Sequence, residues 1–411
     1  MKIFKFGGAS VKDANSVKNL AEVLRAVGHE NTFLVVSAMG KTTNALEEVV
    51  RLYFDEGNYD AKISEIRNTH LNIAEELFED PIVMKEINRI FEDLNDFLKR
   101  NKSPNYDFVY DQVVCCGELV STKIISAYLN AVHIKNNWLD VRDYIKTDDT
   151  YREGKVDWEL THENFTRLQK NERYVTQGFL GSDPNYFTTT LGREGSDYSA
   201  AIIAYCLNAE SLTIWKDVPG VLNADPRYFD NAQLLNKISY EEAIELAYYG
   251  ASVIHPKTMQ PLRKKQIPFF VKSFLDPQGE GTQIRNGQLL EPFVPCYIVK
   301  KEQTLLTLTT LDFSFITEDK ISEVFNLLHQ LKIKVNLMQN SAITLSLCVE
   351  DKYNQLGIFM EQVTPFYEVE SENDVSLYTL RHFENLGETF HHGKELLRQI
   401  IKNTLQIIVK E

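Results

Sequence analysis

A glycine pair separates a predicted strand from a predicted helix at the start of the chain, and this leaves few folds open. Lys2–Phe6 has the apolar residues of a short strand, Gly7-Gly8 follow at once, and Ala9-Ser10 open a helical pattern. Adjacent glycines let the backbone turn tightly with its amides exposed. The helix N-terminus adds free N–H groups, and Lys5 adds an ammonium group. The segment matches neither GxGxxG nor GxxxxGK[ST]. It predicts a phosphate-binding turn, although an ordinary strand–turn–helix start explains it equally well.

Strands and helices alternate along the first two thirds of the chain. Residues 32–37 (TFLVVS) form an apolar strand, a small polar loop follows, and a helix is predicted at 45–53. Such alternation predicts parallel strands covered by helices on both faces, with loops at their carboxyl ends converging on a ligand. Residues 56–102 predict a helical insertion that caps the sheet. Further strands are predicted at 133–140, 174–178, 187–190, 212–215 and 268–273.

The pattern changes after two prolines near residues 290–295, where we place a domain boundary. Beyond it, residues 304–370 predict the order βαββαβ, which is typical of a small α+β module. Residues 375–380, 393–402 and 405–409 add only a strand, a helix and a strand. A length of 411 residues suits two or three domains. The sequence thus predicts an α/β domain followed by an α+β region.

Composition argues against several classes of protein. The net charge of −14 disfavours general affinity for nucleic acid or anionic membranes. No apolar run is long enough to cross a bilayer. Met1 leads directly into the first strand, so we expect no signal or transit peptide. The five cysteines are odd in number and lack metal-ligand spacing, which predicts reduced, mostly buried thiols in a cytoplasmic protein.

Two polar turns concentrate charged residues in the middle of the chain. Residues 190–200 (TLGREGSDYSA) crowd a cation, a hydroxyl and a carboxylate into one turn, at Arg193, Ser196 and Asp197. Residues 215–227 (WKDVPGVLNADPR) form a long turn-rich segment that holds Lys216, Asp217, Asp225 and Arg227. An N-capping Asp and a Pro-Gly turn explain part of both stretches. The charged groups favour a binding site, and the second stretch has the length to wrap a nucleotide.

Two single residues each have a structural and a functional explanation. Glu118 is predicted at the start of a helix, where the helix dipole favours an acid. Alternatively, Glu118 receives the amino group of a substrate. His255 precedes Pro256, and we expect a packed or backbone-bonded histidine there rather than a general base.

Five stretches resemble the aspartokinases of the amino acid kinase superfamily, in order along nearly the whole chain. They are KFGGAS at 5–10, VVSAMGKTTNAL at 35–46, LGREGSDYSA at 191–200, WKDVPGVLNADPR at 215–227 and SYEEAIELAYYGASVIHP at 239–256. The C-terminal region resembles the ACT regulatory domains of the same enzymes. The resemblance implies a three-layer α-β-α parallel-sheet amino acid kinase catalytic domain at 1–291. It also implies an ACT-type α+β regulatory region at 296–411, with one complete unit near 300–372 and a shortened second unit at 373–411.

The resemblance further implies ATP-dependent phosphorylation of the β-carboxylate of L-aspartate to 4-phospho-L-aspartate, the first step towards lysine, threonine and methionine. ATP is the co-substrate and carries Mg²⁺ on its phosphates, without a protein metal site. Lys5 and Asp197 are the implied catalytic residues. Glu118 takes the amino group of aspartate and Arg193 its α-carboxylate, and the full set of implied substrate-binding residues is Ser37, Thr43, Glu118, Arg193 and Ser196. The implied ATP-binding residues are Lys5, Gly7, Gly8, Ser10, Lys216, Asp217, Leu222, Asp225 and Arg227.

Several positions depart from the family's pattern. Ala9 replaces the common threonine of the first motif, and Glu194 replaces a glycine of LGRGGSD. Ser252 replaces a lysine that often contacts nucleotide phosphates, whereas Lys216 stands where WTDV has threonine. We hypothesise that Lys216 supplies the missing cation, and Lys257, beyond His255-Pro256, is a less suitable substitute.

Regulation and the alternative functions follow from the same resemblance. Contacts with a lysine or threonine effector are expected at Met338, Ser341 and Ala342, although a plain hairpin turn explains this stretch equally well. We expect a homodimer or a higher homo-oligomer. Two other functions stay open. One is a related kinase acting on another carboxylate, such as glutamate or acetylglutamate, and the other is a catalytically silent amino acid sensor that keeps the fold.

Overall fold

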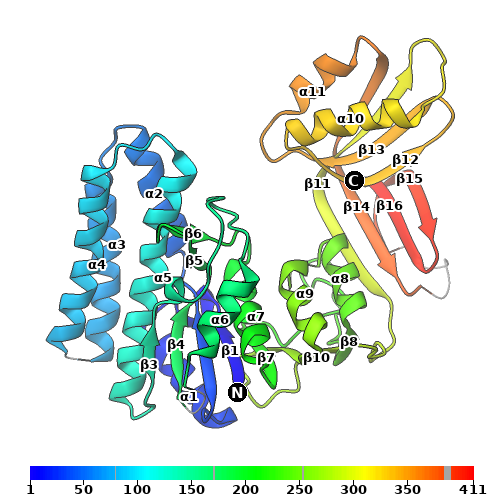
Figure 1. Ribbon diagram of the computed structural model, residues 1–411. Helices are drawn as coiled ribbons and strands as arrows, with labels where there is room; N and C mark the ends of the chain where they lie inside the picture. Colours follow the sequence, from blue (N-terminus) through cyan, green and yellow to red (C-terminus); the bar gives the residue numbers. More distant parts are fainter. Residues whose placement is uncertain (79, 170–171, 252–253, 384–389) are drawn as a thin grey trace. The chain divides into compact units, whose positions relative to one another are not determined.

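The computed structural model describes residues 1–411 except residue 79 and residues 170–171, 252–253 and 384–389. The chain divides into two compact units (Figure 1). The first comprises residues 1–221, 234–244 and 253–291, and the second comprises residues 222–233, 245–252 and 292–411. Each unit has its own sheet and its own apolar core.

The first unit is built on an eight-stranded sheet with the order β3-β4-β2-β1-β7-β9-β10-β8. Neighbouring strands pair in parallel, except β9 and β10, which are antiparallel. The strands are β1 (Lys2–Phe6), β2 (Thr32–Val36), β3 (Asn137–Leu139), β4 (Tyr174–Gln177), β7 (Ser211–Lys216), β8 (Lys237–Ser239), β9 (Phe269–Ser273) and β10 (Thr282–Arg285). A separate antiparallel hairpin is formed by β5 (Leu180–Ser182) and β6 (Thr188–Thr190).

Helices cover both faces of this sheet (Figure 1). Phe4 and Phe6 of β1 share a core with apolar residues of α1 and α5, whereas Lys5 reaches α7 on the opposite face, as the alternation of a strand requires. The helical segments are η1 (Gly8–Val11), α1 (Ala14–Val27), α2 (Thr42–Phe54), α3 (Tyr59–Leu77), α4 (Pro81–Arg100), α5 (Tyr106–Ala131), η2 (Val141–Asp143), α6 (Trp158–Thr166), α7 (Gly195–Leu207), α8 (Tyr240–Tyr249) and α9 (Pro256–Lys265). The predicted parallel sheet between helical layers is confirmed.

Two helix starts differ from the sequence-based expectation. Ala9-Ser10 belong to the single 3₁₀ turn η1, and α1 begins only at Ala14, where the Asp13 side chain accepts the Ser16 amide. Helix α5 begins at Tyr106 instead of near Glu118, which lies in its middle. Because α5 is buried on most sides, its apolar residues do not repeat with the 3.6-residue period that marks an amphipathic helix. The helix-dipole explanation of Glu118 is therefore wrong.

The second unit contains a six-stranded antiparallel sheet with the order β12-β13-β11-β14-β16-β15. Its strands are β11 (Cys296–Thr310), β12 (Lys334–Asn340), β13 (Thr344–Glu350), β14 (Tyr367–Arg381), β15 (Lys394–Ile401) and β16 (Thr404–Lys410). Helices α10 (Glu318–Gln330) and α11 (Leu356–Val363) pack on β11 and β13 through Val324, Leu328 and Phe359. The predicted βαββαβ order at 304–370 and the α+β class of this region are confirmed.

The helix predicted at 393–402 is wrong. Lys394–Ile401 form β15, an edge strand that pairs antiparallel with the buried strand β16. The two strands meet at a tight turn in which Lys402 has a positive φ of 53°. Leucine and isoleucine pairs in KELLRQII suit a helical face as well as a strand, so the partner strand decides the conformation. The described residues of 373–411 hold strands and no helix.

The helices and the cysteines of the structure bear on two expectations drawn from composition. Within the described ranges, no helix has both the length and the apolar character needed to span a bilayer. All five cysteines are buried free thiols, as predicted.

Candidate active site

The Gly7-Gly8 turn lies at the carboxyl end of β1 and packs against the turn after β2. A Cβ atom on Gly8 would lie 2.8 Å from the carbonyl oxygens of Ala38 and Gly40, and the Gly40 amide donates to the Gly8 carbonyl at 3.0 Å. Any side chain at Gly8 would therefore push the two turns apart. The buried Ser10 hydroxyl donates to the Trp215 carbonyl at 3.4 Å and ties the same turn to β7. Three adjacent strand ends thus meet here, where ligands bind in open α/β sheets.

A buried ion pair joins β1 to α7 beside this turn. Lys5 Nζ lies 2.6 Å from Asp197 Oδ1, and Lys216 Nζ lies 3.7 Å from Asp197 Oδ2. The Lys5 and Asp197 side chains are only 9% and 4% exposed. Burial alone would raise the pKa of Asp197, but the two ammonium groups hold it below its usual value. Two ammonium groups thus flank one carboxylate, and a cluster of this kind suits an anionic ligand.

Glu118 supplies a second buried carboxyl group, from the middle of α5. Its burial raises the pKa of Glu118 to about 8, against the opposing effects of the Lys5 ammonium and the Ala38 amide. No group among the described residues donates a hydrogen bond to Glu118 Oε2. A buried carboxyl oxygen without a partner is unfavourable, and a cationic ligand group would satisfy it. Glu118 is therefore suited to bind an ammonium group.

The loop before α7 carries Arg193 and Ser196. Gly192 and Glu194 both adopt left-handed conformations there, with φ angles of 78° and 53°. Arg193 is exposed. Ser196 packs so closely on Gly178 that a Cβ atom on Gly178 would lie 2.5 Å from Ser196 Cβ. The loop thus brings a guanidinium and a hydroxyl to the end of α7 that also carries Asp197.

Ser37 and Thr43 follow β2 towards the same side of the sheet. The Ser37 amide donates to the Phe6 carbonyl at 3.1 Å, and the Ser121 hydroxyl of α5 donates to the Ser37 carbonyl at 2.8 Å. Thr43 lies in the first turn of α2. These bonds connect the ends of β1 and β2 to the helix of Glu118.

The remaining predicted nucleotide residues fall into two groups. Asp217 is exposed directly after β7 in the first unit, whereas Leu222, Asp225 and Arg227 belong to the second unit. The Arg227 guanidinium hydrogen-bonds both Asp225 oxygens, the nearer at 2.6 Å, and this contact lowers the pKa of Asp225. Asp225 and Arg227 already balance each other's charge, and their binding of ATP stays a prediction.

The segment around His255 was expected to be structural. His255 Nδ1 accepts the Lys257 amide at 3.2 Å and caps α9, so the predicted backbone-bonded histidine is confirmed. The Lys257 ammonium lies over the Tyr198 ring, 5.9 Å from its centroid. Ser252, the departure from the family's lysine, lies outside the described residues.

Asp111 was not among the residues predicted from the sequence. It is a fully buried carboxylate on α5 that accepts hydrogen bonds from the strand leading to the Arg193 loop. The signal that would have found it is its spacing of seven residues from Glu118, which places both acids on one face of a helix.

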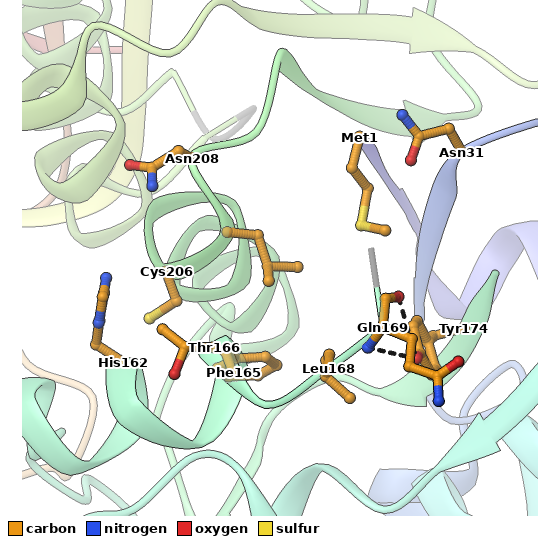
Figure 2. A pocket seen from close by; sticks show the side chains of 11 residues that line it. Met1, Asn31, His162, Phe165, Thr166, Leu168, Gln169, Tyr174, Cys206 and Asn208 are labelled. Atoms are coloured by element: carbon orange, nitrogen blue, oxygen red, sulfur yellow. Dashed lines mark hydrogen bonds between the residues drawn. The ribbon is translucent and has the colours of Figure 1, made fainter. Parts of the chain in front are cut away.

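A cavity of about 350 Å³ lies at the opposite, amino end of the sheet (Figure 2). Its lining includes Met1, Asn31, His162, Phe165, Tyr174 and Cys206, and no predicted site residue. Burial raises the pKa of Cys206 to about 12, so its thiol is not a nucleophile at neutral pH. Among the described residues, no group of three or more His, Cys, Asp or Glu side chains is arranged to hold a metal ion.

The sequence of this chain is similar to that of a known protein family. Residues 1–273 match the model of the amino acid kinase family. The lysine-sensitive aspartokinase 3 of Escherichia coli is 33% identical over 354 residues, which cover 85% of this chain and 78% of that protein. The chloroplastic aspartokinase 1 of Arabidopsis thaliana is 31% identical over 362 residues, which cover 85% of this chain and 63% of that protein.

The fold of this chain is also similar to that of solved aspartokinase structures. The structure of Escherichia coli aspartokinase III in complex with lysine and aspartate (T-state) has a TM-score of 0.83 at 29% identity. Its complex with aspartate and ADP (R-state) has a TM-score of 0.81 at 28% identity. Each match covers 100% of this chain and 96% of the solved chain. The resemblance inferred from the five motifs is confirmed. The chain therefore belongs to the amino acid kinase family, in which it groups with the aspartokinases.

Proposed function

We propose that this chain is an aspartate kinase that phosphorylates the β-carboxylate of L-aspartate. A carboxylate oxygen forms a bond to the γ-phosphorus of ATP while the bond from that phosphorus to the β,γ-bridging oxygen breaks, giving 4-phospho-L-aspartate and ADP. Its relatives are aspartokinases, and the Escherichia coli enzyme of the same fold was solved with aspartate and ADP. The observation that carries the proposal is the buried Lys5–Asp197 pair beside the Gly7-Gly8 turn, within electrostatic reach of the unsatisfied Glu118 carboxyl.

Catalysis in this proposal depends on positioning and charge more than on acid–base chemistry. A carboxylate is already nucleophilic at neutral pH, so the barrier lies in bringing two anions together and spreading charge over the moving phosphoryl group. Lys5 neutralises that charge, Asp197 holds the Lys5 ammonium, and the amides of Gly7 and Gly8 bind phosphoryl oxygens. Because the ion pair is buried, its ammonium needs little reorganisation during the reaction.

The amino acid is held at its charged ends. Glu118 accepts the α-ammonium group, which supplies the partner that Glu118 Oε2 lacks. Arg193 is exposed in its loop and binds the α-carboxylate as a planar fork. Ser37, Thr43 and Ser196 add hydrogen bonds.

ATP enters with Mg²⁺ on its phosphates, and Lys216 acts as the second cation of the phosphate site. Its ammonium lies 3.7 Å from Asp197, on the carboxylate that also holds Lys5. Ser10, Asp217, Leu222, Asp225 and Arg227 complete the ATP-binding set. Lys216 takes the place of the lysine that the family carries at position 252, where this chain has serine.

Regulation and organisation complete the proposal. Residues 1–291 form the catalytic domain and residues 296–411 the regulatory region, with a full ACT unit near 300–372 and a shortened one at 373–411. Lysine or threonine binds near Met338, Ser341 and Ala342, at the end of the edge strand β12, and lysine is the effector named for the Escherichia coli relative. The chain acts as a homodimer or larger homo-oligomer in the cytoplasm.

The test is an acceptor panel. Coupled detection of ADP release is run with ATP and L-aspartate, L-glutamate, N-acetylglutamate or no acceptor, and hydroxylamine traps the acyl phosphate. We expect ADP and hydroxamate only with aspartate. Turnover with another carboxylate would indicate a different kinase of the family, and no turnover with any acceptor would indicate a silent sensor. Titration of lysine, threonine and methionine into the active assay then identifies the effector.

A further inference from the structure

Asp111 is a buried carboxylate to which three hydrogen-bond donors converge. Asp111 Oδ1 accepts the Thr190 hydroxyl at 2.7 Å, and Asp111 Oδ2 accepts the amides of Thr190 and Arg152, each at 2.9 Å. The residue is 0% exposed. Burial raises the pKa of Asp111 to about 6, although the three donors and the Arg152 charge oppose this. A buried carboxylate is retained in a fold only where donors of this kind satisfy it.

The donors belong to two segments that α5 also contacts beside Asp111: Gln112 exchanges two hydrogen bonds with Thr188, and the Arg152 guanidinium lies over the Tyr110 ring. Thr190 ends β6 and stands three residues before Arg193, and β6 packs against α5 (Figure 1). Arg152 belongs to the loop after η2, and its neighbour Gly154 donates its amide to the Thr190 carbonyl at 2.8 Å. The Gly192 backbone also packs on this loop, because a Cβ atom there would lie 3.4 Å from the Arg152 carbonyl. Asp111 is therefore the buried contact of α5 with the end of the strand that leads into the Arg193 loop, and Gln112 holds the start of the same strand.

The same helix carries Glu118. Asp111 and Glu118 are seven residues apart, so they lie on one face of α5 about 10 Å from each other along its axis. In the proposed function, Glu118 holds the α-ammonium and Arg193 the α-carboxylate of one small substrate. Their separation must be fixed for both ends to be held at once.

We propose that Asp111 is a positioning residue that sets the distance between the Arg193 loop and Glu118 and thereby the affinity for the amino acid substrate. It touches neither substrate. This inference rests on the proposed function. It adds a residue that positions Glu118 and Arg193 relative to each other, so that both ends of the amino acid are bound at once. It predicts a defect confined to the amino acid, because the nucleotide side depends on other contacts, at Gly8 and Lys216.

The chain offers a matched control. Asp183, in the turn between β5 and β6, is 1% exposed and also accepts two backbone amides, from Asn185 and Phe187, and one hydroxyl, from Tyr151. It lies at the far end of the same hairpin from Thr190. Asp183→Ala removes the same kinds of hydrogen bonds as Asp111→Ala without releasing the Arg193 loop. Asp111→Asn is the rescue variant, because an amide oxygen can accept both backbone amides while its NH₂ group donates to the Thr190 hydroxyl.

Steady-state kinetics and thermal unfolding of these full-length variants test the inference. For Asp111→Ala we expect KM for aspartate to rise at least about tenfold, with KM for ATP within about twofold of the parent. Asp183→Ala should lose thermal stability with both KM values unchanged, and Asp111→Asn should stay close to the parent. If Asp111→Ala does not fold, Thr190→Val removes the hydroxyl donor alone and should raise KM for aspartate about threefold.

Two results would overturn the inference. One is an unchanged KM for aspartate in Asp111→Ala, or in Thr190→Val where only that variant folds. The other is an equal effect of Asp111→Ala and Asp183→Ala on both KM values, which would indicate a purely structural role. Both require an active parent chain. A parent without aspartate-dependent ADP release would instead overturn the proposed function.

Discussion

Lys5 is the residue on which the proposed chemistry depends most. Lys5→Met keeps most of the apolar stem and removes the ammonium that neutralises the phosphoryl group. We expect kcat to fall by about 10²–10³, as for the loss of one preorganised electrostatic group, with ADP binding retained. Lys12→Met, an exposed lysine in the same segment, should leave kcat unchanged. A Lys5→Met variant as active as the parent would remove the basis of the mechanism.

Glu118 links binding to stability through its protonation. Its pKa is about 8 in the folded chain against an ordinary value of 4.5. Between these values the unfolded chain loses the proton that the folded chain keeps, so the stability of the parent falls as pH rises from 4.5 to 8. Glu118→Gln cannot titrate, so its free energy of unfolding relative to that of the parent should rise with pH, by about 5 kcal/mol in total across this window.

Urea unfolding of both proteins at pH 5 and pH 8.5 measures this difference. Glu118→Gln should also bind aspartate more weakly than the parent at pH 8.5, because a neutral amide attracts an ammonium group less than a carboxylate does, and the difference should shrink at pH 5, where the free parent keeps Glu118 protonated. A stability difference that does not change with pH would contradict the buried, protonated state of Glu118.

Lys216 carries the hypothesis of a displaced cation. Lys216→Thr restores the residue usual in the family's motif and removes the ammonium 3.7 Å from Asp197. KM for ATP should rise about five- to tenfold, which corresponds to about 1 kcal/mol of lost binding. Lys216→Arg keeps the charge and should stay within about twofold of the parent. An unchanged KM for ATP in Lys216→Thr would show that this chain needs no substitute for the missing lysine.

At the scale of secondary structure, local sequence was sufficient where one face of an element is buried and the other exposed. The helices of 56–102, α10 and the strands of 304–370 follow their predicted periods because each has such faces. Helix α5 and strand β15 do not. The first is buried nearly all round, and the second takes its conformation from pairing with β16. The burial of α5 and the pairing of β15 both depend on other parts of the chain, so the sequence of each segment alone does not reveal them.

A glutamate stands at the start of α7 where the family has glycine, and this substitution affects the stability of the helix start. Glu194, in place of the family's glycine, has a φ of 53°, and one of its carboxyl oxygens is buried with no hydrogen-bond partner among the described residues. A left-handed non-glycine residue costs about 1–2 kcal/mol. Glu194→Gly should therefore raise the free energy of unfolding, by about 1 kcal/mol or more.

Glu56 provides the comparison for Glu194. It is an exposed glutamate with a φ of 55° just after α2, so Glu56→Gly relieves the backbone alone. Urea unfolding should give a smaller gain for Glu56→Gly than for Glu194→Gly, because only Glu194 also has the buried oxygen. Equal gains would show that this oxygen finds a partner in solution.

At the scale of the molecule, the sequence motifs predicted the residues of the candidate site, but they did not predict the buried hydrogen bonds that hold those residues in place. Lys5, Gly8, Asp197 and Lys216 meet at the ends of β1 and β7, as expected for loops at the carboxyl edge of a parallel sheet. The hydrogen bonds of Asp111 could not be predicted from the sequence, because they join residues that are far apart in the sequence through one buried carboxylate. The motifs contain the residues proposed to bind ligands, whereas long-range hydrogen bonds such as those of Asp111 form only once the chain has folded.

The overall charge makes a prediction for the whole molecule. Aspartate and ATP are anions, and they approach a chain with a net charge of −14 to reach a site whose cations are largely buried. Salt screens exposed charges over about 10 Å at 0.1 M but screens buried pairs much less. Added salt should thus weaken the general repulsion more than the local attraction. We expect kcat/KM for aspartate to rise as tetramethylammonium chloride increases from 10 to about 150 mM, with kcat nearly constant. A fall in kcat/KM over this range would mean that exposed cations such as Arg193, rather than the buried pair, dominate the attraction of the substrates.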